Sequence, residues 1–319
     1  MRRFCFAALS ALAVLCNEAP AQNYPVRPVR LIVPGVPGAP SDVVARQIAT
    51  PLAVEIGQPV IVDNRPGAAG LIAAQEAARS PPDGYTLLYA LNNNVLRDIA
   101  PNAKYTIDKS FVPITRTTLQ AYIIVVHPSV QASSLADLIA LAKARPGSLT
   151  YASGGPGGVT SLLGALLRTD AGIDMLEVPY KTLGAEFPNL LAGQVLIAFE
   201  TGSVVAQQIR SGKLKALAAT RGRRVAAFPD IPTTAEAGLP EVEVTAWGGI
   251  LAPIGTPQSI IRLLHQRLTA AINTPTFKEH VMATGGEIGG DSPEEFAAFL
   301  NAESAKWSKL IKTAGVKLE

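Results

Sequence analysis

Two spacings of apolar residues alternate along the chain. Short apolar and β-branched runs, typical of buried strands, are separated by longer segments with apolar residues at every third or fourth position, as on one helix face. The runs predict strands at Val29–Val33, Val60–Val62, Thr86–Tyr89, Ala121–Val126, Leu149–Tyr151, Met175–Val178, Leu196–Phe199, Ala216–Thr220 and Trp247–Leu251. The helical spacing predicts helices at about Ser41–Ile56, Gly70–Ala78, Ser134–Ala144, Thr160–Ala171, Ala185–Ala192, Val204–Ser211, Pro257–Asn273, Thr276–Thr284 and Ser292–Ala314. Strands alternating with helices predict an α/β protein with doubly wound, parallel sheets covered on both faces.

Three predicted strands end in a similar way, with a turn of Gly, Pro and small polar residues before helix-like spacing. These segments are Leu31–Asp42, Leu87–Asn94 and Leu149–Ser161. Such turns expose backbone N–H groups at a helix N-terminus, where the helix dipole favours an anion. Ligands of open α/β sheets bind outside the carboxyl ends of strands. Since no turn carries Cys, His or Lys, the pattern predicts a site that holds an anion and does not transform it.

The length of the chain indicates two lobes. Its 319 residues exceed what one hydrophobic core usually serves. A boundary near Pro113–Leu119, and a return of the chain near Trp247–Pro253, predict a first lobe made of residues 22–116 and 247–319. Residues 117–246 then form the second lobe. The three turns meet in this arrangement only across a cleft between the lobes.

The N-terminus has the pattern of a secretory signal peptide. Arg2 and Arg3 precede an apolar stretch from Phe4 to Cys16, and Ala19-Pro-Ala21 is a small-x-small cleavage site. The apolar stretch is too short to span a bilayer as a stable helix, which disfavours a membrane anchor. We therefore predict a signal peptide at residues 1–21, cleavage near Ala21 and export to the periplasm.

The composition of the chain further limits the kinds of site that we expect in it. Cys5 and Cys16 are the only cysteines, so the mature chain would have no disulfide and no thiolate ligand. Charged residues make up 17% of the chain, with a net charge of +3 and no basic run, which gives nucleic-acid binding little support. His127, His265 and His280 have no metal-ligand spacing. We expect neither an enzyme nor a metal or cofactor.

Segments spread from about residue 24 to 315 resemble, in order, the periplasmic solute receptors of tripartite tricarboxylate transporters, also called Bug receptors. The matching segments are Tyr24-Pro-x-Arg-Pro28, Leu31–Asp42, Gly57–Val60, Asn64–Gly67, Pro82–Leu87, Tyr151–Ser153, Val178–Lys181, Leu191–Gln194, Gly212–Leu217, Pro232–Gly238, Ala246-Trp247 and Leu251–Pro253. The resemblance implies a two-lobed type II periplasmic-binding-protein fold with an interlobe ligand cleft. It further implies a monomer that captures a small carboxylate and delivers it to membrane transporter subunits.

The resemblance and the turns together give a set of expected ligand-binding residues. They are Gly35, Gly38, Ala39, Ser41, Asp42, Asn92, Asn93, Ser153, Gly155, Thr160, Ser161, Tyr180, Thr182, Glu200 and Thr201. Ser or Asp at a helix start caps free N–H groups in any protein, so Ser41 and Asp42 have an ordinary structural explanation as well. The resemblance favours ligand contact by Ser41 and the Gly38 and Ala39 backbones, with Asp42 as a cap and water holder.

Several of these positions depart from the family pattern. Gly35 stands where the family usually has Phe, and Ala39 where it has Gly. The apolar Leu91 precedes three Asn residues in place of a Gly/Ser/Thr-rich turn, and Ser161, Thr182 and the pair Glu200-Thr201 also differ. Asn side chains offer amide donors and acceptors. These changes predict a reshaped pocket for a bulkier or more polar acid than a simple dicarboxylate.

Other interpretations remain open at this stage. The run Gly154–Gly158 is also explained as a tight turn, and its near match to a dinucleotide fingerprint lacks the last Gly and a placed acidic residue. Asn92 and Asn93 are also common turn residues. The same clamp could serve as a sensor that signals to a membrane protein without transport, and the sequence does not separate the two functions.

Overall fold

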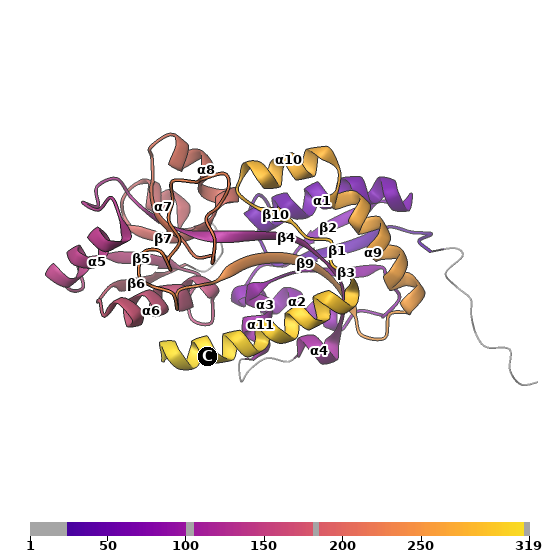
Figure 1. Cartoon of the computed structure of the whole chain (residues 1–319). Coiled ribbons are helices and arrows are strands. Elements are labelled where there is room, and N and C mark those ends of the chain that lie inside the picture. Colours follow the sequence, from indigo (N-terminus) through magenta and orange to yellow (C-terminus); the bar gives the residue numbers. More distant parts are fainter. Residues whose placement is uncertain (1–23, 100–104, 181–184, 316–319) are drawn as a thin grey trace, which may run out of the picture.

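The computed structural model describes residues 24–99, 105–180 and 185–315 (Figure 1), and the predicted signal peptide lies outside them. The strands are β1 (Val29–Val33), β2 (Val60–Asn64), β3 (Thr86–Leu91), β4 (Phe111–Val126), β5 (Thr150–Ser153), β6 (Leu176–Pro179), β7 (Ile197–Thr201), β8 (Lys215–Ala219), β9 (Thr245–Pro253) and β10 (Glu287–Ile288). The helices are α1 (Pro40–Ile56), α2 (Leu71–Ala78), α3 (Asn92–Asp98), α4 (Ile107–Ser110), α5 (Leu135–Ala144), α6 (Val159–Ala171), α7 (Phe187–Leu191), α8 (Gly202–Arg210), α9 (Gln258–Ile272), α10 (Pro275–Ala283) and α11 (Pro293–Ala314), with a 3₁₀ turn at Ala68–Gly70. Within these residues no helix combines the length and apolar character needed to cross a membrane.

One sheet runs through the molecule in the order β2-β1-β3-β9-β4-β7-β5-β6, and β8 and β10 also pair with β4. β2, β1 and β3 are parallel, and so are β7, β5 and β6. β9 is antiparallel to both β3 and β4, and β4 is antiparallel to β7. The α/β class is therefore confirmed, whereas the expectation of purely parallel sheets is wrong at β4 and β9. Hydrophobic spacing identifies a strand but carries no information on its direction.

The two antiparallel strands cross the middle of the molecule (Figure 1). Residues Phe111–Ala121 of β4 pair with β9, and residues Tyr122–Val126 pair with β7, while β8 joins β4 from Ile123 onward. The expected lobe boundary at Pro113–Leu119 thus lies within one continuous strand. Between Ala121 and Tyr122, the pairing partner of β4 changes from β9 to β7. The division of the chain into lobes remains a prediction.

Helices cover both faces of the sheet. α1 and α9 pack together over β1, β3 and β9 through an apolar cluster that includes Ile48, Leu52, Ile261 and Leu264. On the other side lie α2, α3 and the long α11, which extends to α6 of the second half (Figure 1). The C-terminal helix therefore buries apolar surface against both halves of the sheet.

Local signals explain most helix boundaries. Ser134 and Asp137 form a capping box at the start of α5, and Ser292 and Glu295 form another at α11, as their sequence pattern predicts. α3 and α4 were not among the expected helices. α3 begins in an Asn-rich segment that favours turns, and it is stabilised by the Asn94 side chain, whose Oδ1 accepts from the Leu91 N–H at 2.8 Å.

A buried carboxyl group fixes α11 to the sheet. Oε2 of Glu303 accepts hydrogen bonds from the indole N–H groups of Trp247 and Trp307, each at 3.1 Å. Glu303 is buried, and burial raises its pKa despite the two indole donors. Since Trp247 belongs to β9 and Trp307 to α11, this one side chain connects the crossing strand with the C-terminal helix.

We predict that Glu303→Ala lowers the free energy of unfolding by about 2–4 kcal/mol, because it leaves two buried N–H donors without an acceptor. Glu303→Gln keeps an acceptor oxygen and should cost less than half as much. Urea denaturation measures both, with Lys309→Ala on the exposed side of the same helix as the control. Equal stability of the Glu303→Ala and Lys309→Ala variants would contradict this interpretation.

Candidate functional site

A cavity of about 740 Å³ lies where the two halves of the sheet meet. This volume is typical of small-molecule sites. Its walls come from the strand-to-helix turns of both halves and from the crossing strands β4 and β9. The lining segments are Pro34–Ser41, Pro66-Gly67, Ala69-Gly70, Leu91–Asn93, Ala152–Gly154, Gly158–Thr160, Ala185–Phe187, Phe199–Thr201 and Ala246–Gly248, with single residues such as Tyr89, Gln120, Tyr122 and His280.

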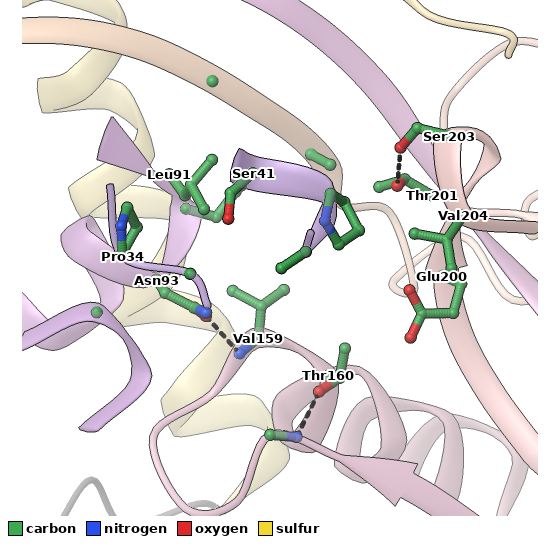
Figure 2. A pocket seen from close by; sticks show the side chains of 18 of the residues that line it. Pro34, Ser41, Leu91, Asn93, Val159, Thr160, Glu200, Thr201, Ser203 and Val204 are labelled. Atoms are coloured by element: carbon green, nitrogen blue, oxygen red, sulfur yellow. Dashed lines mark hydrogen bonds between the residues drawn. The ribbon is translucent and has the colours of Figure 1, made fainter. Parts of the chain in front are cut away.

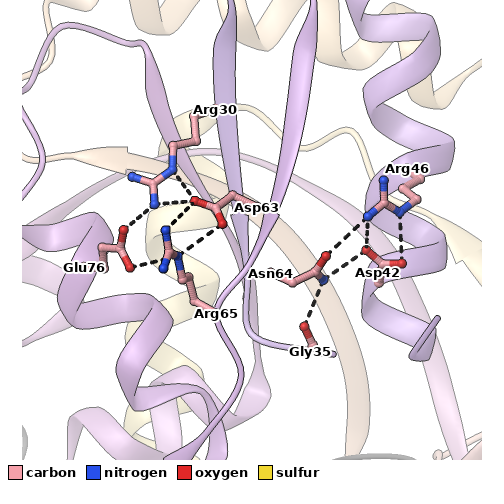
Figure 3. A network of polar contacts seen from close by, with 8 residues as sticks. All are labelled: Arg30, Gly35, Asp42, Arg46, Asp63, Asn64, Arg65 and Glu76. Atoms are coloured by element: carbon pink, nitrogen blue, oxygen red, sulfur yellow. Dashed lines mark hydrogen bonds and ion pairs between the residues drawn. The ribbon is translucent and has the colours of Figure 1, made fainter. Parts of the chain in front are cut away.

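The first turn is stabilised by Asp42, whose side chain points back into the loop before α1 (Figure 3). Its carboxylate accepts from the Gly38 N–H at 2.9 Å, from Arg46 Nε at 3.0 Å and from Asn64 Nδ2 at 3.0 Å. Burial acts to raise the pKa of Asp42, but the hydrogen bonds from Arg46, Gly38 and Asn64 lower it below its ordinary value. Asp42 is therefore an ionised structural anchor of this turn.

Two further bonds shape the same loop. Asn64 Nδ2 also donates to the Gly35 carbonyl at 2.9 Å, and the Ala39 N–H donates to the Val36 carbonyl at 3.0 Å. The N–H groups of Gly38 and Ala39, which we expected to face a ligand, thus have partners within the loop. Within the described residues no acceptor bonds to the N–H groups of Ser41 and Asp42 in the first turn of α1. Among the described residues, these two N–H groups are donors left without a partner.

Ser41 is the polar side chain at the centre of this wall (Figure 2). Its Oγ is buried and has no hydrogen-bond partner among the described residues. A Cβ atom added at Gly35 would lie only 2.1 Å from this Oγ. The Gly at position 35 is therefore explained by the Ser41 hydroxyl, because a side chain there would require Ser41 to move.

On the other side of this wall, the end of β2 carries a cluster of ion pairs (Figure 3). Arg65 Nε lies 3.1 Å from Asp63 and 3.2 Å from Glu76, and Arg30 pairs with the same two carboxylates. These contacts connect β1, β2 and α2. Arg65 thus has a structural role, and the cluster supports the loop that includes Pro66 and Gly67 of the cavity wall.

The Asn92 and Asn93 side chains of the second turn form hydrogen bonds to other segments of the protein. Asn92 donates to the Thr245 carbonyl at 2.8 Å and accepts from the Trp247 N–H at 2.9 Å, so its amide is bonded to β9. Asn93 Oδ1 accepts from the Val159 N–H at 3.0 Å, which joins the second turn to the start of α6 (Figure 2). Both Asn residues line the cavity, but the hydrogen-bond partners of their side chains are protein groups.

The third turn is built in the same way as the first. The Ser153 hydroxyl donates to Glu177 at 2.6 Å and accepts from the Gly155 N–H at 3.0 Å, and Gly155 adopts a positive φ of 81°. Thr160 Oγ1 accepts from the Gly154 N–H at 2.9 Å. The N–H groups of Thr160 and Ser161, in the first turn of α6, bond to no acceptor in the part of the chain that the structure describes.

The wall opposite Ser41 carries acidic and hydroxyl groups (Figure 2). Burial and the neighbouring carboxyl of Glu186, which is hydrogen-bonded to Glu200, raise the pKa of Glu200 well above its ordinary value. Next to it, the hydroxyls of Thr201 and Ser203 lie 2.7 Å apart. The polar groups of this wall are therefore carboxyl and hydroxyl groups, which are neutral or negatively charged.

The structure brings most of the expected residues to one cavity. Those that line it are Gly35, Gly38, Ala39, Ser41, Asn92, Asn93, Ser153, Thr160, Glu200 and Thr201. Asp42, Gly155, Ser161 and Tyr180 are not among the lining residues, and Thr182 lies outside the described residues. Tyr180 instead accepts from Asn189 Nδ2 at 3.0 Å. Ligand contact by any of these residues remains a prediction.

Sequence reasoning missed the aromatic residues of the lining and Glu186, whereas Glu200 was expected. Tyr89, Phe199 and Trp247 lie on predicted strands, but they belong to continuous apolar and buried runs, so the sequence carries no alternation that marks a cavity-facing side. Glu186 and Phe187 lie at the start of α7, where no hydrophobic pattern pointed to a site. Among the described lining residues there is no Lys or Arg, and no group of three His, Cys, Asp or Glu in the described chain is placed to hold a metal ion.

The fold and this cavity define a two-lobed, type II solute-binding protein. The chain belongs to the tripartite tricarboxylate transporter family receptors, whose family model matches residues 44–316. This confirms the family resemblance found in the sequence.

Similar proteins cover nearly the whole chain. BugT of Bordetella pertussis is 36% identical over 97% of this chain and 96% of its own length. The structure of R. palustris Rpa4515 with adipate has a TM-score of 0.87 and 32% identity, covering 92% of this chain and 99% of that one. MatC from Rhodopseudomonas palustris with bound malate has a TM-score of 0.84 and 28% identity, covering 90% and 100%. Its relatives thus share the full two-lobed architecture.

We predict that Asp42→Asn lowers the free energy of unfolding at neutral pH by about 1–3 kcal/mol, because the first turn loses charge-assisted hydrogen bonds. Since the folded-state pKa of Asp42 is lowered, its contribution is present above the unfolded pKa and is lost as the pH falls through the folded pKa. The difference between the wild type and Asp42→Asn should therefore shrink below about pH 4.

Urea denaturation between neutral and acid pH measures this difference. Asp230→Asn, at an exposed position, is the matched control and should follow the wild type at every pH. A stability difference for Asp42→Asn that is constant across the pH range would contradict the proposed role of the ionised carboxylate.

Proposed function

We propose that this chain is a periplasmic receptor that captures a small organic acid in the cavity and delivers it to a tripartite tricarboxylate-type membrane transporter. The observation that carries the proposal is the meeting of two helix starts at one cavity. The first turns of α1 and α6 each present N–H groups with no acceptor among the described residues, at Ser41 and Asp42 and at Thr160 and Ser161. Helix N-termini of this kind favour a carboxylate.

The ligands of the two structural relatives support the same chemical class. One was solved with adipate and the other with malate, and both molecules are carboxylic acids. The described lining has no Lys or Arg. In our proposal the acid is therefore recognised by N–H and hydroxyl dipoles, as the helix starts offer, with water bridging where direct contact is too long.

The binding free energy of such a ligand must be the sum of many small contributions. One helix terminus contributes about 0.3–2 kcal/mol, whereas micromolar affinity needs about 8 kcal/mol. The Ser41 hydroxyl, the N–H groups of both turns and the aromatic surfaces of Tyr89, Phe187 and Trp247 would supply the rest. Because the two helix starts lie on different halves of the sheet, the ligand would favour the closed arrangement of the lobes.

The proposal includes the location and the division of the chain. Residues 1–21 would direct export and be removed near Ala21, which places the mature receptor in the periplasm. Residues 22–116 and 247–319 would form one lobe and residues 117–246 the other, with a single copy of the chain binding the ligand. Binding is proposed to occur without turnover, and a sensor role without transport is the alternative.

We predict that at least one small carboxylate stabilises the refolded mature chain, residues 22–319, against heat. After denaturation and refolding to remove bound ligand, a panel of mono-, di- and aromatic carboxylates and amino acids is tested by thermal unfolding. A ligand at a thousand times its dissociation constant adds about 4 kcal/mol, which corresponds to a shift of at least about 5 °C.

Ser41→Ala should reduce the shift that the best ligand produces, since it removes a hydroxyl with no other described partner. Ser259→Ala on α9 is the control and should leave the shift unchanged. If a well-folded chain responds to no acid in the panel, the receptor proposal is wrong. If acids bind but a host strain lacking the gene takes up the ligand normally, the transport part is wrong and the sensor role is favoured.

A further inference from the structure

Two carboxyl groups meet in the cavity wall opposite the helix starts. Glu200 lies near the end of β7 and Glu186 directly before α7, and the two side chains are hydrogen-bonded to each other. Both residues line the cavity. In Figure 2, Glu200 lies across the cavity from Ser41 and extends from its strand toward the interior. The cavity therefore has an acidic end and an N–H-rich end.

The described lining of the cavity contains no Lys or Arg, and His280 is its one histidine. The titratable side chains there are Glu186, Glu200, Tyr89, Tyr122 and His280. Burial and Glu186 raise the pKa of Glu200, which is typical of two close carboxyl groups that share a proton. A ligand carboxylate brought to this end would meet groups of its own sign, whereas a ligand cation could take the place of the shared proton.

Aromatic side chains near the two Glu residues also favour a ligand cation. Phe187, Phe199 and Tyr122 line the cavity beside the two Glu residues. The faces of aromatic rings attract ammonium groups, and this attraction grows where water is excluded. Aromatic surface next to carboxylates is thus a better environment for an amine than for a second carboxylate.

We propose that the ligand is an ω-amino carboxylate, with its carboxylate at the first turns of α1 and α6 and its protonated amine at Glu200 and Glu186. This inference rests on the proposed receptor function and specifies the ligand class of the same cavity. It separates this chain from the two relatives above, since adipate and malate carry a carboxylate at each end. Amine binding would favour the ionised form of Glu200, so that a proton held by Glu200 is released.

The test is isothermal titration of the refolded chain with pentanoate, glutarate and 5-aminopentanoate, and with the corresponding acids one carbon shorter and longer. The amino acid of the best length should bind at least about 10-fold more tightly than the dicarboxylate of equal length, because an amine paired with a desolvated carboxylate contributes strongly. Glu200→Gln should reduce this preference by at least about 10-fold, and Glu200→Asp should retain most of it.

Glu241→Gln, the same change at an exposed position, is the matched control and should keep the wild-type preference. Titrations in buffers of different ionisation enthalpy add an independent readout. The wild type should release a proton when 5-aminopentanoate binds near neutral pH, and Glu200→Gln should not. A purely structural role of Glu200 would change the affinity for all acids without changing proton release.

Two results would overturn the inference. If glutarate binds as tightly as 5-aminopentanoate, or if Glu200→Gln weakens pentanoate as much as it weakens 5-aminopentanoate, the amine site is wrong while the receptor function stands. If no acid of any length binds, both the amine site and the receptor function are wrong.

Discussion

Backbone N–H groups at a helix start must find partners outside the helix. Among the described residues, two helix starts meet at one cavity, which Ser41 of α1 and Thr160 of α6 line. The bonds around these starts keep the remaining donors occupied. Asp42 accepts the Gly38 N–H in the first turn, and Thr160 accepts the Gly154 N–H in the third. Asn93 then joins the second turn to the start of α6 through the Val159 N–H. The polar side chains of the turns thus chiefly hold the backbone of the turns in place. In our proposal the ligand binds the backbone N–H groups that these side chains do not occupy.

The architecture places these turns opposite each other because β4 and β9 run through both halves of the sheet. β4 pairs with β9 up to Ala121 and with β7 from Tyr122 onward. α11 adds a second connection, because Glu303 joins it to Trp247 of β9. The crossing strands and α11 thus connect the two halves of the sheet, while each turn is fixed to its own strand.

Much of this arrangement follows from the sequence, for identifiable physical reasons. Local spacing and capping residues predicted β1, α5 and α11, because the signal for each lies within the element itself. The antiparallel direction of β4 and β9 depends on tertiary pairing, which spacing does not encode. α3 was missed because its Asn residues favour turns and the partners that hold them, such as Thr245 and Gly70, are distant in sequence. In the site, the glycine-rich turns predicted segments that line the cavity, whereas Glu186 was found only when the fold placed it beside Glu200.

The most direct measurement is a crystal structure of the mature chain with the acid that binds most tightly. If the helix starts hold the anion, one carboxylate will lie within hydrogen-bond distance, directly or through one water, of the N–H groups of Ser41 or Asp42 and of Thr160 or Ser161. A ligand bound outside this cavity, or a carboxylate held only at the wall that carries Glu200, would contradict the assignment of the anion to the two helix starts.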